Sequence, residues 1–219
     1  MRFQKFINEN GEETLEMRKD DIISDCQPFL KMLKKTGYNF LYSGRTRPGD
    51  VYKRKVRKNR RPSDTPQEIH EVVDNMFKRE FGVRARGNSM FASVEWESVE
   101  YYGEPYYLFP VGKYKLIWSS KVPDLFAYIK KTLMDEFNTG VSLGDFFRDI
   151  RKDEEYFEEV MSFVEMHFEE KVLPTYGETK DTSDIKTPNE IMVMANEVWL
   201  VNSVEISKKY MRDFIKDTV

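Results

Sequence analysis

Seven basic side chains with no intervening acid lie in the stretch KRKVRKNRR, residues 53 to 61. Lys and Arg bind phosphate groups by charge and by hydrogen bonding, so this stretch is suited to docking a polyanion. The whole chain of 219 residues has a net charge of −3, and its remaining surface should repel nucleic acid. We predict a local nucleic-acid-binding loop, with a solvated loop that has no partner as the alternative. Its basic residues are Lys53, Arg54, Lys55, Arg57, Lys58, Arg60 and Arg61.

Most familiar catalytic and metal-binding motifs are missing from the sequence. It has no phosphate-binding glycine-rich loop, no dinucleotide fingerprint and no nucleophile elbow. The two histidines, His70 and His167, each fall on an expected helix without a second ligand four residues later, so we expect no metal site. We expect a surface or boundary position for His70 and a salt-bridged surface position for His167. Cys26 is the single cysteine, which excludes an internal disulfide. The lone cysteine, with no apolar run of membrane-spanning length, predicts a cytoplasmic protein without a membrane partner.

Three separated segments remain that could carry chemistry: FLYSGRTRP, GNSMFASVEWESVEYYG and PNEIMVMANEVWLV. Together and in this order they resemble the signature blocks of the ADP-ribosyltransferase superfamily. The most similar branch includes the poly(ADP-ribose) polymerases and the diphtheria-type toxins. In the second block that family has an aromatic-Phe-Ala group, five residues, Ser, two residues and Tyr. Phe91, Ala92, Ser98 and Tyr101 follow this spacing without a gap.

The resemblance implies that NAD is the substrate and that no metal is needed. Ser98 would bond the nicotinamide amide, Tyr101 would stack on the nicotinamide ring, and the Gly44 backbone would approach the amide closely. Glu190 would bond the ribose 2′-hydroxyl and stabilise the positive charge that develops on the ribose as nicotinamide leaves. By this resemblance the catalytic residues are Glu190 and Ser43, and the cofactor-binding residues are Gly44, Arg45, Arg47, Met90, Phe91, Ser98 and Tyr101.

The chain departs from the family pattern at three positions. Ser43 stands where the family has His or Arg, and a hydroxyl bonds a ribose more weakly than a charged group does. Arg45 and Arg47 are close enough in sequence to hold the pyrophosphate instead. Met90 replaces an aromatic ring of the nicotinamide site, and Pro188 replaces the glutamate of the arginine-modifying branch. These departures predict that binding is better retained than turnover and that arginine is not the acceptor.

The resemblance therefore favours an NAD-dependent mono-ADP-ribosyltransferase, a transferase of the glycosyltransferase type. The basic stretch makes nucleic acid a plausible acceptor, and protein is the other option. The alternative is a non-catalytic accessory module that binds nucleic acid or protein through residues 53–61, and a third, weaker hypothesis is a nucleotide hydrolase that uses Glu190 with water. The chain is also similar in style to the small accessory proteins of tailed phages, which would place it in the host cytoplasm.

These residues must be positioned by an α+β fold in a single domain, residues 1–219. We expect an N-terminal helix within 1–37, a mixed or antiparallel ADP-ribosyltransferase-like β core from 38–120 and 186–204, and a C-terminal helix at 206–217. Residues 122–172 read as a helical insertion, and residues 174–188 as an exposed loop. The clearest single helix lies between Thr65, a predicted cap, and Gly82, a predicted stop.

Overall fold

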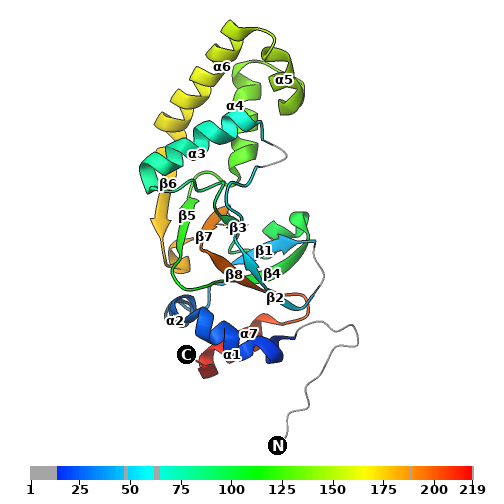
Figure 1. Cartoon of the computed structure of the whole chain (residues 1–219), viewed down its shortest axis with the longest axis vertical. Helices are drawn as coiled ribbons and strands as arrows, with labels where there is room; N and C mark the ends of the chain where they lie inside the picture. Colours follow the sequence, from blue (N-terminus) through cyan, green and yellow to red (C-terminus); the bar gives the residue numbers. More distant parts are fainter. Residues whose placement is uncertain (1–13, 47–48, 62–64, 188, 219) are drawn as a thin grey trace, which may run out of the picture.

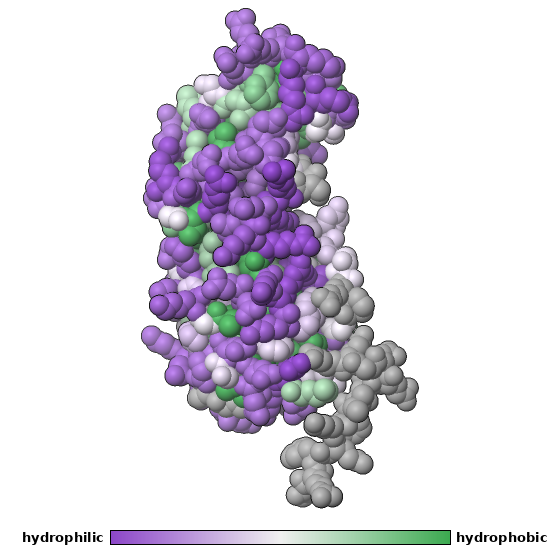
Figure 2. Space-filling model, viewed as in Figure 1, coloured by the Kyte–Doolittle hydropathy of each residue, from purple (hydrophilic) through white to green (hydrophobic). Residues whose placement is uncertain are grey.

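The protein is described by a computed structural model that covers residues 14–46, 49–61, 65–187 and 189–218. The strands form two sheets in the middle of an elongated molecule, with one group of helices at each end (Figure 1). This arrangement confirms the expected α+β class. The face shown in Figure 2 is largely hydrophilic, and its hydrophobic residues form small separate patches.

Both sheets have four strands, and neighbouring strands within each sheet are antiparallel. The strand order is β1-β4-β8-β2 in the first sheet and β3-β7-β5-β6 in the second. The PVGK segment turns the chain from β4 into β5, at the place that the sequence predicts. The strands are β1 (Tyr42–Arg45), β2 (Val51–Lys55), β3 (Met90–Ala92), β4 (Glu104–Pro110), β5 (Lys115–Ser119), β6 (Tyr176–Thr179), β7 (Ile191–Met194) and β8 (Glu197–Asn202).

The helices fall into two groups that cover opposite ends of the strands. In Figure 1, α1, α2 and α7 gather at one end, while α3 lies between the second sheet and α4, α5 and α6 at the other end. The helices are α1 (Leu15–Asp25), α2 (Gln27–Lys35), α3 (Gln67–Phe81), α4 (Leu125–Glu136), α5 (Leu143–Ile150), α6 (Glu154–His167) and α7 (Lys208–Thr218), with short turns of helix η1 (Glu97–Tyr102), η2 (Phe168–Val172), η3 (Leu173–Thr175) and η4 (Thr182–Asp184).

Helix α3 follows its sequence pattern closely. Ile69, Val73 and Phe77 recur at a spacing of four residues and are fully buried on one face. Gly82 ends the helix with a φ of 73°, a left-handed conformation that glycine adopts without steric cost. The predicted Thr65 cap is wrong, because Pro66 occupies the cap position and no side chain caps the helix.

The core is divided in two by the second sheet. Ile191 and Val193 of β7 join a cluster with the first sheet and α1, α2 and α7. Met192 lies between them in sequence and joins the other cluster, with α3 and the helices of 122–172. Successive side chains of a strand point to opposite faces, so a strand with a core on both faces must be apolar throughout. This explains why IMVM carries no polar residue.

Two strands lie in segments that the sequence predicts as loops. Residues 53–55 of the basic stretch belong to β2, an edge strand that pairs with β8. Residues 176–179 form β6, an edge strand that pairs with β5. Both strands carry polar side chains on their outer faces, which hides the apolar signal by which a strand is recognised in a sequence.

Candidate functional site

The two sheets meet where β1 lies beside the end of β3. Tyr42 and Ser93 form an isolated antiparallel bridge there, with backbone hydrogen bonds of 2.8 and 2.9 Å. Glu190 immediately precedes β7, the strand that pairs with β3. The start of β1, the end of β3 and the start of β7 are therefore neighbours. We call the side chains gathered here the junction site; they are Ser43, Arg45, Arg60, Arg86, Phe91 and Glu190.

A chain of contacts joins all three sequence blocks at the junction site. The Ser43 hydroxyl donates a hydrogen bond of 2.7 Å to the Phe91 carbonyl. The Arg86 guanidinium lies 5.4 Å from the centre of the Phe91 ring and donates to Glu190 Oε1 over 3.3 Å. These contacts link the buried Ser43 to Glu190 through Phe91 and Arg86, although the three blocks lie far apart in the sequence.

Glu190 is held firmly at its backbone. Its N–H donates to the Pro123 carbonyl over 2.7 Å, and the buried Asn189 side chain donates to the Ser119 carbonyl over 2.6 Å. The Glu190 side chain is 18% exposed, and that of Arg86 only 5%. A ligand could therefore reach the Glu190 carboxylate, whereas the Arg86 side chain is buried.

Asp74 of α3 fixes the backbone at Arg86. The Asp74 carboxylate accepts the backbone N–H groups of Arg86 and Gly87, at 2.8 and 3.0 Å. His70 Nε2 lies 3.7 Å from the same carboxylate. His70 is 5% exposed and buried, so the expected surface or boundary position is wrong, and burial lowers the pKa of its imidazole. His70 and Asp74 both lie on the buried face of α3, and two polar residues on an apolar helix face are the signal that could have identified this support.

Phe91 presents its ring to two guanidinium groups. Arg60 lies 4.4 Å from the ring centre and Arg86 lies 5.4 Å from it, both within the range of cation–π attraction. Met90 precedes Phe91 and points to the other face of β3, where it is buried in the cluster that includes the first sheet and α1, α2 and α7. The predicted cofactor-binding role of Met90 therefore has no support in its position.

Arg45 extends the positive charge of the junction site. Its guanidinium donates to the Ser43 hydroxyl over 2.7 Å, and its buried Nε has no hydrogen-bond partner within the described ranges. Burial and the positive charges of Arg54, Arg60 and Arg57 lower the pKa of Arg45 to about 10, so it remains charged at neutral pH. Buried arginines that face other arginines are suited to binding an anion. Arg47 and Pro188 lie outside the described residues.

Gly44 of β1 and the residues of η1 pack closely together beside the junction site. A Cβ on Gly44 would lie 2.2 Å from the Val99 carbonyl oxygen, so only glycine allows η1 to approach β1 this closely. Ser98 is exposed, and Tyr101 is 92% exposed with its ring edge-on to Tyr102. The Tyr102 hydroxyl donates to Asp124 over 3.3 Å. The predicted nicotinamide-contacting pair, Ser98 and Tyr101, therefore lies on the surface beside the junction site.

The basic stretch does not act as one uniform surface. Lys53 forms ion pairs with Asp25 at 3.0 Å and with Glu197 at 3.3 Å, which offset its charge. Arg54 points to the other face of β2, and its charge lowers the pKa of Arg45. Lys55, Arg57, Lys58 and Arg61 are exposed. Only these four residues and Arg54 remain candidates for a nucleic-acid surface at this stretch, because Arg60 covers Phe91.

Comparison with known proteins adds no further constraint: no protein-family model, no curated protein and no solved structure matches this chain. Among the described residues, His, Cys, Asp and Glu side chains form no group of three or more that could hold a metal ion. No helix in the described ranges is both long and apolar enough to cross a membrane.

Proposed function

We propose that this protein binds NAD at the junction site and transfers ADP-ribose to a macromolecule. The observation that carries this proposal is the contact chain from Ser43 through Phe91 and Arg86 to Glu190. It assembles the three segments that resemble the ADP-ribosyltransferase blocks around one partly exposed carboxylate. The two antiparallel sheets are compatible with the β core that the resemblance implies.

The chemistry assigned to Glu190 is electrostatic. The bond between the ribose C1′ and the nicotinamide nitrogen breaks, and nicotinamide leaves with the electron pair. The carboxylate accepts a hydrogen bond from the ribose 2′-hydroxyl and stabilises the oxocarbenium-like charge on the ribose. An acceptor nucleophile then bonds to C1′ and loses its proton.

The arginines of the junction site would hold the diphosphate of NAD. Arg45 and Arg60 provide fixed guanidinium groups, whose fork geometry matches phosphate oxygens. Arg86 would orient the partly exposed Glu190 carboxylate toward the ribose. The exposed Tyr101 ring would cover the nicotinamide only after η1 or the side chain moves toward Glu190.

A second candidate function is nucleic-acid binding without catalysis. The observation that favours it is the exposure of Lys55, Arg57, Lys58 and Arg61 on an otherwise acidic protein. The same surface would serve a transferase whose acceptor is nucleic acid. Both functions would use this surface. They differ because a transferase would modify the nucleic acid, whereas a binding module would leave it unmodified.

Incubation of the full chain with NAD labelled in its adenylate part tests the proposal. Samples with single-stranded DNA, RNA or a protein mixture are separated after the reaction. Label on a macromolecule supports transfer, whereas free labelled ADP-ribose alone indicates hydrolysis. Unchanged NAD in all samples, together with a salt-dependent shift of nucleic acid, would replace the proposal with the binding module.

A further inference from the structure

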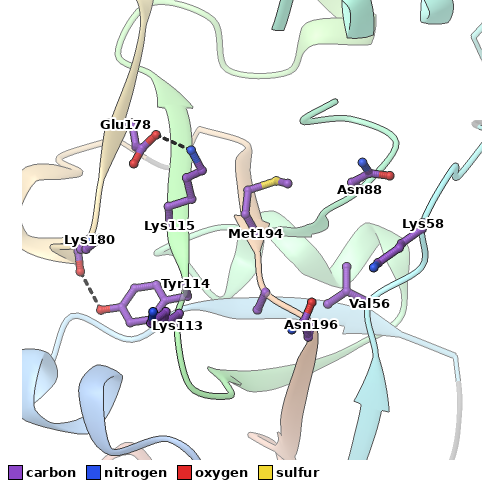
Figure 3. A pocket seen from close by; sticks show the side chains of 11 residues that line it. Val56, Lys58, Asn88, Lys113, Tyr114, Lys115, Glu178, Lys180, Met194 and Asn196 are labelled. Carbon is purple, nitrogen blue, oxygen red and sulfur yellow. Dashed lines mark hydrogen bonds and ion pairs between the residues drawn. The ribbon is translucent and has the colours of Figure 1, made fainter. Parts of the chain in front are cut away.

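A pocket of about 520 Å³ lies at the other end of β7 from Glu190 (Figure 3). It is lined by the segment after β2, the turn between β4 and β5, the strand β6 and the turn between β7 and β8. Its volume is within the range of sites that bind nucleotides and other small ligands. We call it the lysine pocket, after the basic residues that line it.

Positive charge dominates the lining of this pocket. Lys58, Lys113, Lys115 and Lys180 contribute to it from different strands and turns, and Glu178 is the acid among its lining residues. Glu178 already forms an ion pair of 2.7 Å with Lys115, which also donates to the Phe81 carbonyl over 3.1 Å. The remaining lysines thus face the pocket without a carboxylate to offset them there.

The structure gives these remaining lysines no internal role. Lys58, Lys113 and Lys180 are exposed, and within the described part of the chain none of their ammonium groups forms an ion pair. Lys58 extends from the segment after β2 toward Asn196 in Figure 3. Like charges that converge on one concave surface repel each other, and a bound anion relieves that repulsion.

The rest of the lining is suited to a nucleobase. Val56, Met194 and Ala195 supply apolar surface, and methionine adapts to flat ligands because its side chain is flexible. Asn196 supplies a side-chain amide that can donate to and accept from the edge of a base. Asn88 supplies amide N–H donors, and its oxygen accepts from the Asn59 N–H over 3.0 Å. The Tyr114 ring lies at the side of the pocket near Lys113 and Lys180, and a hydrogen bond of 2.7 Å from its hydroxyl to the Lys180 carbonyl fixes it (Figure 3).

We propose that the lysine pocket binds a nucleoside polyphosphate. The base contacts the apolar residues and the asparagine amides, and the phosphates contact Lys58, Lys113 and Lys180. This site lies apart from the junction site and uses none of its residues, so the inference does not depend on the function proposed above. Its ligand would act as a second, separate nucleotide on the same chain.

Isothermal titration of the full chain with ATP at low salt tests this inference, with adenosine as the phosphate-free control. We expect ATP to bind and adenosine to show no detectable binding. The double variant Lys113→Glu/Lys180→Glu should weaken ATP binding by about tenfold or more, since it reverses two charges at the phosphates. The matched control Lys131→Glu/Lys209→Glu changes the net charge equally at exposed lysines outside the pocket and should change the affinity less than about twofold. Glu190→Gln should leave ATP binding unchanged.

Three results of the titrations with ATP and adenosine would overturn the inference, and a fourth comes from an oligonucleotide. The three are the absence of ATP binding at millimolar concentration, equal weakening in the pocket variant and the control variant, and equal binding of adenosine and ATP. Binding of a 5′-phosphorylated oligonucleotide without binding of ATP would also contradict it, because the site would then recognise a strand and not a nucleotide.

Discussion

The two ends of β7 hold positive charge in opposite ways. At the Glu190 end, Arg86 is buried and its contacts with Glu190, Phe91 and the Asp74-bound backbone make it part of the structure. At the Met194 end, Lys113 and Lys180 are exposed, and no acid offsets them in the described part of the pocket. Basic residues at the two ends of one strand therefore differ in role. A basic residue with an internal acidic partner stabilises the fold, whereas an exposed one without such a partner is available to a ligand.

The same contrast occurs within the basic stretch itself. Lys53 and Lys58 are five residues apart, yet Lys53 is paired with Asp25 and Glu197 while Lys58 reaches into the lysine pocket. A count of charges in the sequence treats the two lysines as equal. The fold distinguishes them, because the pairing of β2 with β8 brings Glu197 within reach of the Lys53 ammonium group and the end of α1 brings Asp25 there.

The largest expected effect is the loss of Arg86. Arg86→Met should lower the free energy of unfolding by about 3 kcal/mol, because it removes the buried guanidinium group that pairs with Glu190. Urea unfolding followed by circular dichroism measures the change. Arg84→Met is the matched control, since Arg84 is exposed and its guanidinium donates to the side chain of Asn75 on α3. This substitution should cost less than about 1 kcal/mol. An equal loss in both variants would remove the distinction between the buried and the exposed arginine.

A smaller effect is expected for the partner of Lys53. Burial alone would raise the pKa of Asp25, but hydrogen bonds from Trp199 and Lys53 hold it below its ordinary value of 3.8. The native state therefore binds protons less readily than the unfolded state, and this contribution to stability is present above pH 3.8 and is lost as the pH falls through the lower native pKa. Because Asp25 is partly exposed, we expect a contribution of no more than about 1 kcal/mol.

Asp25→Asn should accordingly lose stability at neutral pH and lose less than the wild type on acidification. Unfolding free energies measured at about pH 7 and about pH 3 give the difference between the two proteins. If the variant and the wild type have equal unfolding free energies at both pH values, the Asp25–Lys53 ion pair does not stabilise the fold. Lys53 would then be grouped with the lysines that form no ion pair.

The smallest effect on stability is expected at the lysine pocket. Lys113→Ala/Lys180→Ala should change the free energy of unfolding by less than about 0.5 kcal/mol in either direction, because exposed lysines without ion pairs contribute little to folding. Thermal unfolding without ligand measures this. A clear loss of stability would mean that these lysines hold the fold together, as Arg86 does, and the comparison between the two ends of β7 would no longer hold.

Much of the fold can be predicted from local pattern. The apolar face of α3, its stop at Gly82 and the turn between β4 and β5 depend on neighbouring residues, and the structure has them where the sequence predicts them. The edge strands β2 and β6 are missed because their outward side chains are polar and their strand character comes from pairing with β8 and β5. Thr65 shows the opposite failure, in which a suitable cap residue is present but the helix begins without it.

The candidate site is predicted only in part for a related reason. Glu190, Ser43 and Phe91 stand out by resemblance, and in the structure contacts through Arg86 link them. Arg86 and Asp74 do not stand out, because their importance comes from contacts between residues 104 and 12 positions apart. Met90 shows that a matching position in a motif does not fix the direction of a side chain, since it faces the core.

The most direct test of the central claim is the NAD reaction of Glu190→Gln beside Glu158→Gln, a substitution of the same kind at an exposed glutamate of α6. The measurement is the rate of label transfer from NAD at saturating concentration, with NAD binding measured in parallel. We predict that Glu190→Gln lowers the rate by about 100-fold or more while NAD still binds, since the carboxylate stabilises the transition state more than the ground state. Glu158→Gln should react at the wild-type rate. Turnover that Glu190→Gln leaves unchanged would contradict the account.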